Sequence, residues 1–260
     1  MSLIYPLIGF FLFVSCSSLT NTEHFNDNKK TYIEFSKDDY IKHFNLLAKD
    51  YLKNEDVKQV QLSKSSQQYL QNLYYQIIKN NELLLTDSLK LKFYIVNSPR
   101  VFYFSLPGGH IFFSQQLIQK HLEHEALFIS AFCYEIIRTH RNIYQKKIII
   151  PTGFINTEKL IYLTRIEVDT RVEIGKWTYH SVNRSGFDGQ AYLNWLQTQN
   201  KHSLDFVLMF GNSREVSREE FLFKNFLVKN RDSLIKRDVI ALSSTRQYYK
   251  FRKEIARHGK

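Results

Sequence analysis

Cysteine is scarce in this sequence, with Cys16 and Cys133 the only two among 260 residues. The chain therefore does not rely on a framework of disulfide bonds. Cys133 lies in an apolar helical stretch, and we interpret it as a small core residue with an inert thiol. Apolar residues make up 43% of the chain and aromatic residues 15%, which excludes a disordered protein and is enough for the core of one domain.

The N-terminus lacks an apolar run long enough for a confident membrane span. The run from Leu3 to Val14 contains Pro6 and is followed by Cys16 and a polar stretch, a layout typical of a secretory signal that is removed. The position of Cys16 resembles that of a bacterial lipoprotein signal, which implies a lipidated cysteine as the first mature residue. Phe13 stands where a leucine is usual and no Lys or Arg precedes it, so an uncleaved N-terminal anchor is the alternative.

Acidic residues are few towards the C-terminus. Residues 224–260 carry eleven Lys and Arg against three acids, a net charge of +8 out of +11 for the whole chain. A basic segment suits anionic lipid, an acidic partner or nucleic acid, and it is equally compatible with a solvated helical face. Tyr248 and Tyr249 beside basic residues would suit nucleic acid. The exported location argues against that partner, so no nucleic-acid binding is expected.

Apolar residues at helical spacing predict a helix-dominated α+β protein. The helices are expected over residues 36–53, 65–81, 123–142, 157–179, 187–199 and 217–230. Ser36 or Asp38 is the expected N-cap of the first, and Ser217 with Glu220 forms a capping-box pattern at the start of the last. Aromatic and β-branched residues predict strands over residues 89–97, 100–106 and 110–114, with a forced turn at Pro107–Gly109.

Four short motifs follow one another along the chain. They are SLPGGHIFFSQQLI at 105–118, YEIIR at 134–138, TRIEVD at 164–169 and SGFDGQAYLNWL at 185–196. Their order and spacing resemble metallopeptidase family 48, the zinc proteases of the HtpX and BepA type, over most of the chain. The resemblance implies a zincin-like metalloprotease fold with a small β-sheet and a long central helix that carries a degenerate HExxH motif.

The family's functional residues are mostly replaced when they are carried over position by position. Tyr134 stands at the first histidine of HExxH, Glu135 at its glutamate and Arg138 at its second histidine. In the downstream ExxxD motif, Arg165 stands at the third metal ligand and Asp169 at the aspartate that supports the ligands.

The resemblance also implies a substrate cleft. In the family, a Pro-Gly-Gly turn leads into the strand that lines this cleft, which places Pro107, Gly108, Gly109 and His110 along it.

The replacements at the ligand positions bear on the metal. Zinc proteases of this type need two imidazoles four residues apart on one helix face, with the glutamate activating the zinc-bound water. An arginine is always protonated and has no lone pair, so Arg138 and Arg165 predict that zinc is absent. We hypothesise that these arginines form ion pairs with Glu135 and Asp169 in place of the metal. The alternative is that they are unrelated surface charges on amphipathic helices.

The remaining histidines are candidates for a second metal site. His121 and His124 lie at the expected entrance of a helix in the stretch HLEHE, and they are expected to be exposed or capping rather than metal-binding. His140 lies six residues from Tyr134, off the helix face that a ligand would need. The prediction is therefore that this chain has no metal cofactor.

These features favour a catalytically inactive metalloprotease-like protein, not an enzyme, that is lipid-anchored in the bacterial cell envelope through Cys16. It is expected to bind a peptide or protein partner in the retained cleft, where the strand HIFFS would offer an edge for β-augmentation. Two alternatives stay open: an active envelope zinc endopeptidase with atypical ligands, and a scaffold that docks to anionic lipid or an acidic partner through its basic C-terminus. The expected organisation is a signal at 1–16, a linker at 17–35, a metallopeptidase-like domain at 36–230 and a basic helical segment at 231–260.

Overall fold

The computed structural model describes residues 37–82, 84–85, 89–144, 155–230 and 244–257. The expected signal with Cys16 and the linker at 17–35 lie outside the described residues. Residues 36–260 form one compact unit, whose described part contains ten helices and a three-stranded sheet. This confirms the helix-dominated α+β class. Among these described residues, no helix has the length and apolar character needed to cross a bilayer.

The sheet comprises β1 (Lys92–Val96), β2 (Tyr103–Leu106) and β3 (His110–Ser114), in the spatial order β1-β3-β2. All three strands fall inside the predicted ranges. β3 is the central strand, parallel to β1 and antiparallel to β2. Since both edges of β3 are already paired, the expectation that the HIFFS strand offers a free edge for β-augmentation is wrong.

Four helices lie before and after these strands: α1 (Lys37–Lys53), α2 (Lys64–Lys79), α3 (Gln115–Lys120) and α4 (Glu125–Arg141). α1, α2 and α4 confirm predicted helices, whereas α3 was not predicted because six residues are too few to show an apolar repeat. Serine caps two of them. The Ser63 hydroxyl accepts from the Ser66 N–H at the start of α2, and the Ser114 hydroxyl accepts from the Leu117 N–H at the start of α3.

The single helix expected over residues 157–179 is instead two helices, α5 (Thr157–Thr164) and α6 (Val168–Arg184). Between them the backbone at Arg165 is extended, with φ −60° and ψ 138°. The carbonyl groups that the break leaves without helical partners receive hydrogen bonds from two arginines. Arg138 of α4 donates to the oxygen of Thr164, and Arg171, five residues further along the chain on α6, donates to that of Ile166. Tertiary contacts thus override the helical pattern at this point.

Three further helices follow α6: α7 (Gln190–Lys201), α8 (Ser203–Phe210) and α9 (Ser213–Lys229). The expectation that the last of these begins at Ser217 is wrong. Asn212 is its N-cap, and the Asn212 side chain accepts from the Glu215 N–H at 3.0 Å. Ser217 lies inside α9, where its hydroxyl donates to the side-chain oxygen of Asn200. Both sites offer a good capping residue, and the earlier one begins the helix.

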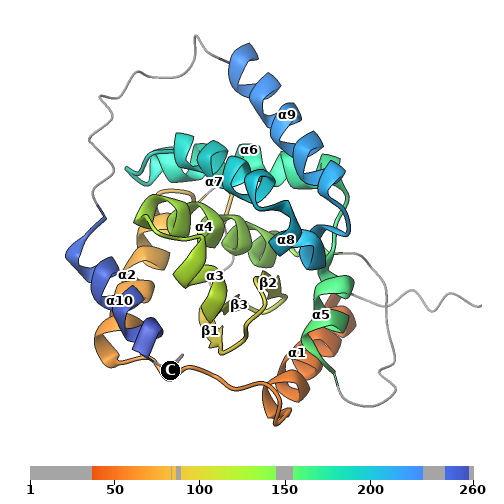
Figure 1. Ribbon diagram of the computed structural model, residues 1–260, viewed down its shortest axis with the longest axis vertical. Helices are drawn as coiled ribbons and strands as arrows, with labels where there is room; N and C mark the ends of the chain where they lie inside the picture. Colours follow the sequence, from red (N-terminus) through yellow and green to blue (C-terminus); the bar gives the residue numbers. More distant parts are fainter. Residues whose placement is uncertain (1–36, 83, 86–88, 145–154, 231–243, 258–260) are drawn as a thin grey trace, which may run out of the picture. The chain divides into compact units, whose positions relative to one another are not determined.

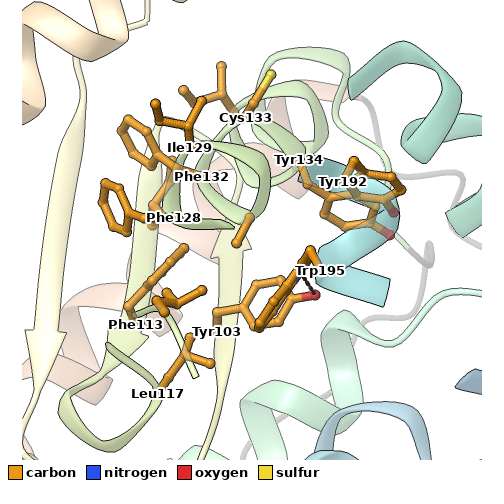
Figure 2. Packing of buried hydrophobic residues seen from close by; sticks show 14 of the residues in the cluster. Tyr103, Phe113, Leu117, Phe128, Ile129, Phe132, Cys133, Tyr134, Tyr192 and Trp195 are labelled. Carbon is orange, nitrogen blue, oxygen red and sulfur yellow. Dashed lines mark hydrogen bonds between the residues drawn. The ribbon is translucent and has the colours of Figure 1, made fainter. Parts of the chain in front are cut away.

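Helix α4 lies at the centre of the unit and is buried along nearly its whole length. It packs against α6 and α7 on one side and against β2 and β3 on the other (Figure 1). Figure 2 shows Phe128, Phe132 and Cys133 of α4 in this core, with the Trp195 indole donating to the Tyr103 hydroxyl at 3.3 Å. Burial raises the pKa of the Cys133 thiol, and its position confirms the prediction of a small core residue.

Both faces of the sheet are covered by apolar side chains. One face joins the α4 core through Tyr103, Ile111 and Phe113. The other contributes Phe104 and Phe112 to a second cluster that includes residues of α1 and α5. Since successive side chains of a strand point to opposite faces, this two-sided burial explains why the strands read as nearly continuous apolar runs.

The last described helix, α10 (Arg246–Arg257), packs against α2 and α3. Its apolar face, formed by Tyr248, Phe251 and Ile255, belongs to the same core as α4. Arg252 donates from its guanidinium to the backbone oxygens of Gln119 and Glu123. The described part of the basic C-terminal segment is therefore helical, as predicted, and it closes the core of the main unit.

Candidate functional site

The position at which the resemblance would place HExxH is occupied by a buried ion pair on α4. The Arg138 guanidinium donates from Nη1 to both Glu135 carboxylate oxygens, at 3.1 Å and 3.2 Å. The side chain of Glu135 is 0% exposed and that of Arg138 is 5% exposed. This confirms the first half of the hypothesis, that Arg138 neutralises Glu135, and it rules out the alternative of an exposed surface charge at Arg138.

The surroundings of Arg138 stabilise its positive charge. Burial by itself would lower the pKa of the guanidinium, but the Glu135 carboxylate, with Tyr134 and Tyr144, outweighs burial and raises this pKa above its ordinary value. The guanidinium carbon also lies 5.3 Å from the centroid of the Tyr144 ring, within cation–π range. Arg138 is thus fixed as a cation beside Glu135.

Tyr134, at the first ligand position, faces a different neighbour. Its ring is stacked on that of Tyr192 from α7, with centroids 6.1 Å apart and an interplanar angle of 10° (Figure 2). Burial raises the pKa of Tyr134 well above its ordinary value, because a phenolate would be poorly solvated there. The side chain is therefore a protonated phenol that packs in the core.

The second half of the hypothesis is wrong, because Arg165 and Asp169 do not meet. Arg165 donates from Nη2 to the backbone oxygen of Leu208 at 2.7 Å. The side chain of Asp169 is 75% exposed and lies 3.4 Å from Arg218. The expected pairing needed both residues on one continuous helix, and the break at residues 165–167 separates them.

A second buried ion pair stands nearby, and sequence reasoning missed it. Arg171 of α6 donates from Nε to Glu219 at 2.6 Å and from Nη1 to Glu215 at 3.1 Å, both on α9. Burial raises the pKa of Glu219, and Arg171 opposes that rise. The only sequence signal was the four-residue spacing of Glu215 and Glu219, which places them on one helix face but names no partner.

These side chains enclose very little space. A cavity of about 30 Å³ is lined by residues that include Tyr134, Glu135, Arg138 and Arg165. That is room for about two water molecules. The residues do not fit a zinc ion: the one carboxylate is engaged by a guanidinium, both arginines lack a lone pair, and the tyrosine is protonated.

The residues expected to line a cleft form a turn between two strands. Gly108 and Gly109 have φ of +83° and +81°, which form the tight turn between β2 and β3. The Gly109 N–H donates to the Thr139 hydroxyl of α4 at 3.0 Å. None of the residues from Pro107 to His110 lines the cavity beside Glu135, and their place along a substrate cleft stays a prediction.

His110 itself is buried behind this turn. Its Nε2 lies 2.9 Å from the side-chain oxygen of Asn45 and 3.1 Å from the Lys92 ammonium. Burial, with the positive charges of Lys92 and Lys49, lowers the pKa of His110 to about 4. The imidazole is therefore neutral at physiological pH.

The other histidines divide into two groups. His124 is exposed and makes no side-chain hydrogen bond as the N-cap of α4, as expected. His121 differs from expectation, because it is 3% exposed and its Nε2 lies 2.9 Å from Asp205. The His121 ring also lies 4.9 Å, centroid to centroid, from that of His202. The sequence signal for this cluster was the spacing His202-x-x-Asp205, which sequence reasoning passed over.

A wider groove opens beside α8. Its volume is about 440 Å³, and its walls include Pro99, Val101, Leu204, Val207 and Leu208. Leu204 is 87% exposed and Val207 is 38% exposed. A volume of this size is within the range of ligand-binding clefts, roughly 300–1,000 Å³.

Comparison with known proteins gives no family assignment: no family model matches the chain, and no curated protein matches it.

Proposed function

We propose that this chain is a catalytically inactive metalloprotease-like protein with a zincin-like fold, and that it acts by binding a partner. The observation that carries the proposal is the buried pair of Glu135 and Arg138 at the HExxH position. The order of the elements supports the zincin-like fold. The sheet is followed by the central helix α4, and α6 then packs against α4.

The chemistry of hydrolysis by this fold requires two functional groups. A metal ion with an open coordination position polarises the substrate, and a free carboxylate accepts the proton of the attacking water. Here the Glu135 carboxylate accepts two hydrogen bonds from Arg138, and both residues are buried. Because Arg138 engages both oxygens of this carboxylate, the residue expected as the base has a stabilising role in this proposal.

The partner surface proposed is the groove beside α8, in place of the cleft of the family. Two cations at its rim are already neutralised, since Arg100 pairs with Glu158 and Lys120 pairs with Asp205. Neutral rim charges and the exposed Leu204 favour an uncharged, apolar segment of a partner polypeptide. The occupant proposed is therefore an extended apolar peptide segment.

Two measurements on the full chain test this function. Incubation with excess zinc and an unfolded protein substrate is expected to give no cleavage; cleavage that Glu135→Gln abolishes would instead support the alternative of an active endopeptidase with atypical ligands. Selection from a displayed random peptide library is expected to enrich apolar peptides whose affinity falls at least about tenfold in Leu204→Asp. Leu46→Asp on α1, where the leucine is 57% exposed, is the matched control and leaves binding unchanged.

A second candidate function rests on the outer face of α10. Arg246, Lys250, Lys253 and Arg257 recur at helical spacing and are exposed. Such a stripe suits a membrane surface that carries anionic lipid. The test is sedimentation with phosphatidylserine vesicles, in which Lys250→Glu combined with Lys253→Glu should abolish binding and raised salt should weaken it. Removal of all residues after 230 is not a suitable test, because it would also remove the core side chains of α10.

The proposed location is the bacterial cell envelope, with a lipid anchor at Cys16. This proposal rests on the sequence of residues 1–16, which lie outside the described residues. Metabolic labelling with an alkyne fatty acid tests it: the label should enter the full chain and be lost in Cys16→Ser, and labelling that persists in that variant contradicts it.

A further inference from the structure

Three potential metal ligands meet at the end of α3 and the junction of α7 and α8. They are His121, which follows α3, His202, the single residue between α7 and α8, and Asp205 in the first turn of α8. One ligand atom from each lies within 4.8 Å of the other two. The cluster is separate from the Glu135 position, whose cavity none of these three residues lines.

The local backbone explains why His202 and Asp205 face His121 together. His202 has φ −112° and ψ 35°, which ends α7 and starts α8 with no further linking residue. The three-residue spacing then places His202 and Asp205 on neighbouring positions of the same turn. Within the described residues, the His202 imidazole has no hydrogen bond and contacts the ring of His121.

Two adjacent imidazoles beside one carboxylate are poorly explained by packing alone. If both imidazoles were protonated they would repel each other, and if both were neutral the carboxylate would satisfy only one of them. A divalent cation between the three groups satisfies both imidazoles and the carboxylate at once.

The geometry points to a zinc-type metal site, and we propose that His121, His202 and Asp205 bind one Zn²⁺ ion. Two nitrogens and one carboxylate oxygen are a donor set that zinc uses with three protein ligands. Metal–ligand bonds of about 2.0 Å give tetrahedral ligand–ligand distances of roughly 3.3 Å. The 2.9 Å between His121 and Asp205 is close to that value, and the other pairs of ligand atoms, within 4.8 Å, need to approach by at most about 1.5 Å.

Lys120 competes with the metal for Asp205 and gives the proposal a distinctive test. Its ammonium lies 2.7 Å from the same carboxylate oxygen that contacts His121. The Lys120 side chain is 47% exposed, so it can turn into solvent when a cation binds. Removal of this competitor should therefore strengthen metal binding, an effect that a purely structural His121–Asp205 hydrogen bond would not produce.

The site also borders the groove beside α8. Asp205 is a ligand in the site and, like Lys120, lines that groove. Three protein ligands leave a fourth coordination position, which water or a carboxylate of a bound segment can fill. A metal here would therefore add a carboxylate to the chemistry that the groove accepts.

The experiment is zinc titration by isothermal calorimetry on the full chain without a metal-binding tag. Wild type is expected to bind one zinc, and His202→Asn or Asp205→Asn to weaken binding by more than about 100-fold, since even residues that only support ligands contribute 10- to 100-fold. Lys120→Met should tighten binding. His124→Asn, three residues from His121 in the sequence and exposed, is the matched control and should bind as wild type does.

Two results would overturn the proposal: no zinc bound by a folded wild-type chain, or equal zinc binding by wild type and the Asp205→Asn variant. Circular dichroism of each variant verifies that it is folded. A zinc-dependent rise in the melting temperature of wild type that is absent in His202→Asn and Asp205→Asn provides a second readout. If Asp205→Asn keeps its zinc and Glu135→Gln loses it, zinc binds at Glu135, and the proposal that this position is inactive is wrong as well. The two variants therefore test the two proposals separately.

Discussion

Removal of the Glu135 carboxylate should destabilise the protein rather than abolish an activity. Glu135→Gln keeps the side-chain shape but leaves the Arg138 guanidinium, 4% exposed, without its counter-ion. Breaking a buried pair by removing one partner costs about 3–5 kcal/mol. The glutamine oxygen can still accept from Arg138, and Thr164 keeps accepting from Nη2, so we expect a loss near the lower limit, about 3 kcal/mol.

Urea denaturation followed by tryptophan fluorescence measures this loss as a lower free energy of unfolding. The double variant Glu135→Gln/Arg138→Met removes both charges and should recover much of the stability, with a coupling energy of up to about 3 kcal/mol. Asp169→Asn is the matched control, because it makes the same acid-to-amide change in an exposed pair and should cost at most about 1 kcal/mol. The reasoning would be refuted if Glu135→Gln lost less than about 1 kcal/mol and the loss in the double variant equalled the sum of the losses in the two single variants.

Three further predictions concern stability and reactivity. Gly109→Ala should lower the free energy of unfolding clearly more than Gly186→Ala, because both glycines have positive φ but only at Gly109 would a Cβ meet backbone, 2.5 Å from the Lys90 oxygen; equal losses in urea denaturation would contradict this. His110 should contribute stability that falls as pH falls from about 6.5 towards about 4, since the unfolded state binds the proton more tightly; the slope is at most about 1.4 kcal/mol per pH unit and should be absent in His110→Gln. Cys133 should not react with a thiol reagent in the native protein and should react fully in urea, whereas rapid native labelling would contradict its burial.

The sequence predicted those elements whose pattern is local. α4 was evident because its apolar run begins with acidic and ends with basic residues, as the helix dipole favours. The three strands were evident from their aromatic residues and the turn at Pro107–Gly109. The break at Arg165 was not, because the apolar pattern does not specify the hydrogen bonds that satisfy the neighbouring carbonyl groups: Arg138, 26 residues away, donates to Thr164, and Arg171 donates to Ile166.

The same distinction applies to the candidate sites. Glu135 and Arg138 are three residues apart on one helix, so their pairing could be predicted from spacing alone. The pair of Arg171 and Glu219 joins residues 48 apart in the sequence. His121 meets Asp205 across 84 residues, and no local pattern specifies such a contact. Long-range contacts of this kind depend on the packing of α3, α8 and α9, which the sequence pattern did not define.

The most direct test of the central claim is a crystal structure of the full chain soaked in zinc, with anomalous scattering recorded at the zinc absorption edge. The account predicts the Arg138 guanidinium against the Glu135 carboxylate and no anomalous peak beside them. A peak near His202 and Asp205 would leave that claim intact. A zinc peak at Glu135, with Arg138 displaced from it, would contradict the claim that an ion pair has taken the place of the metal.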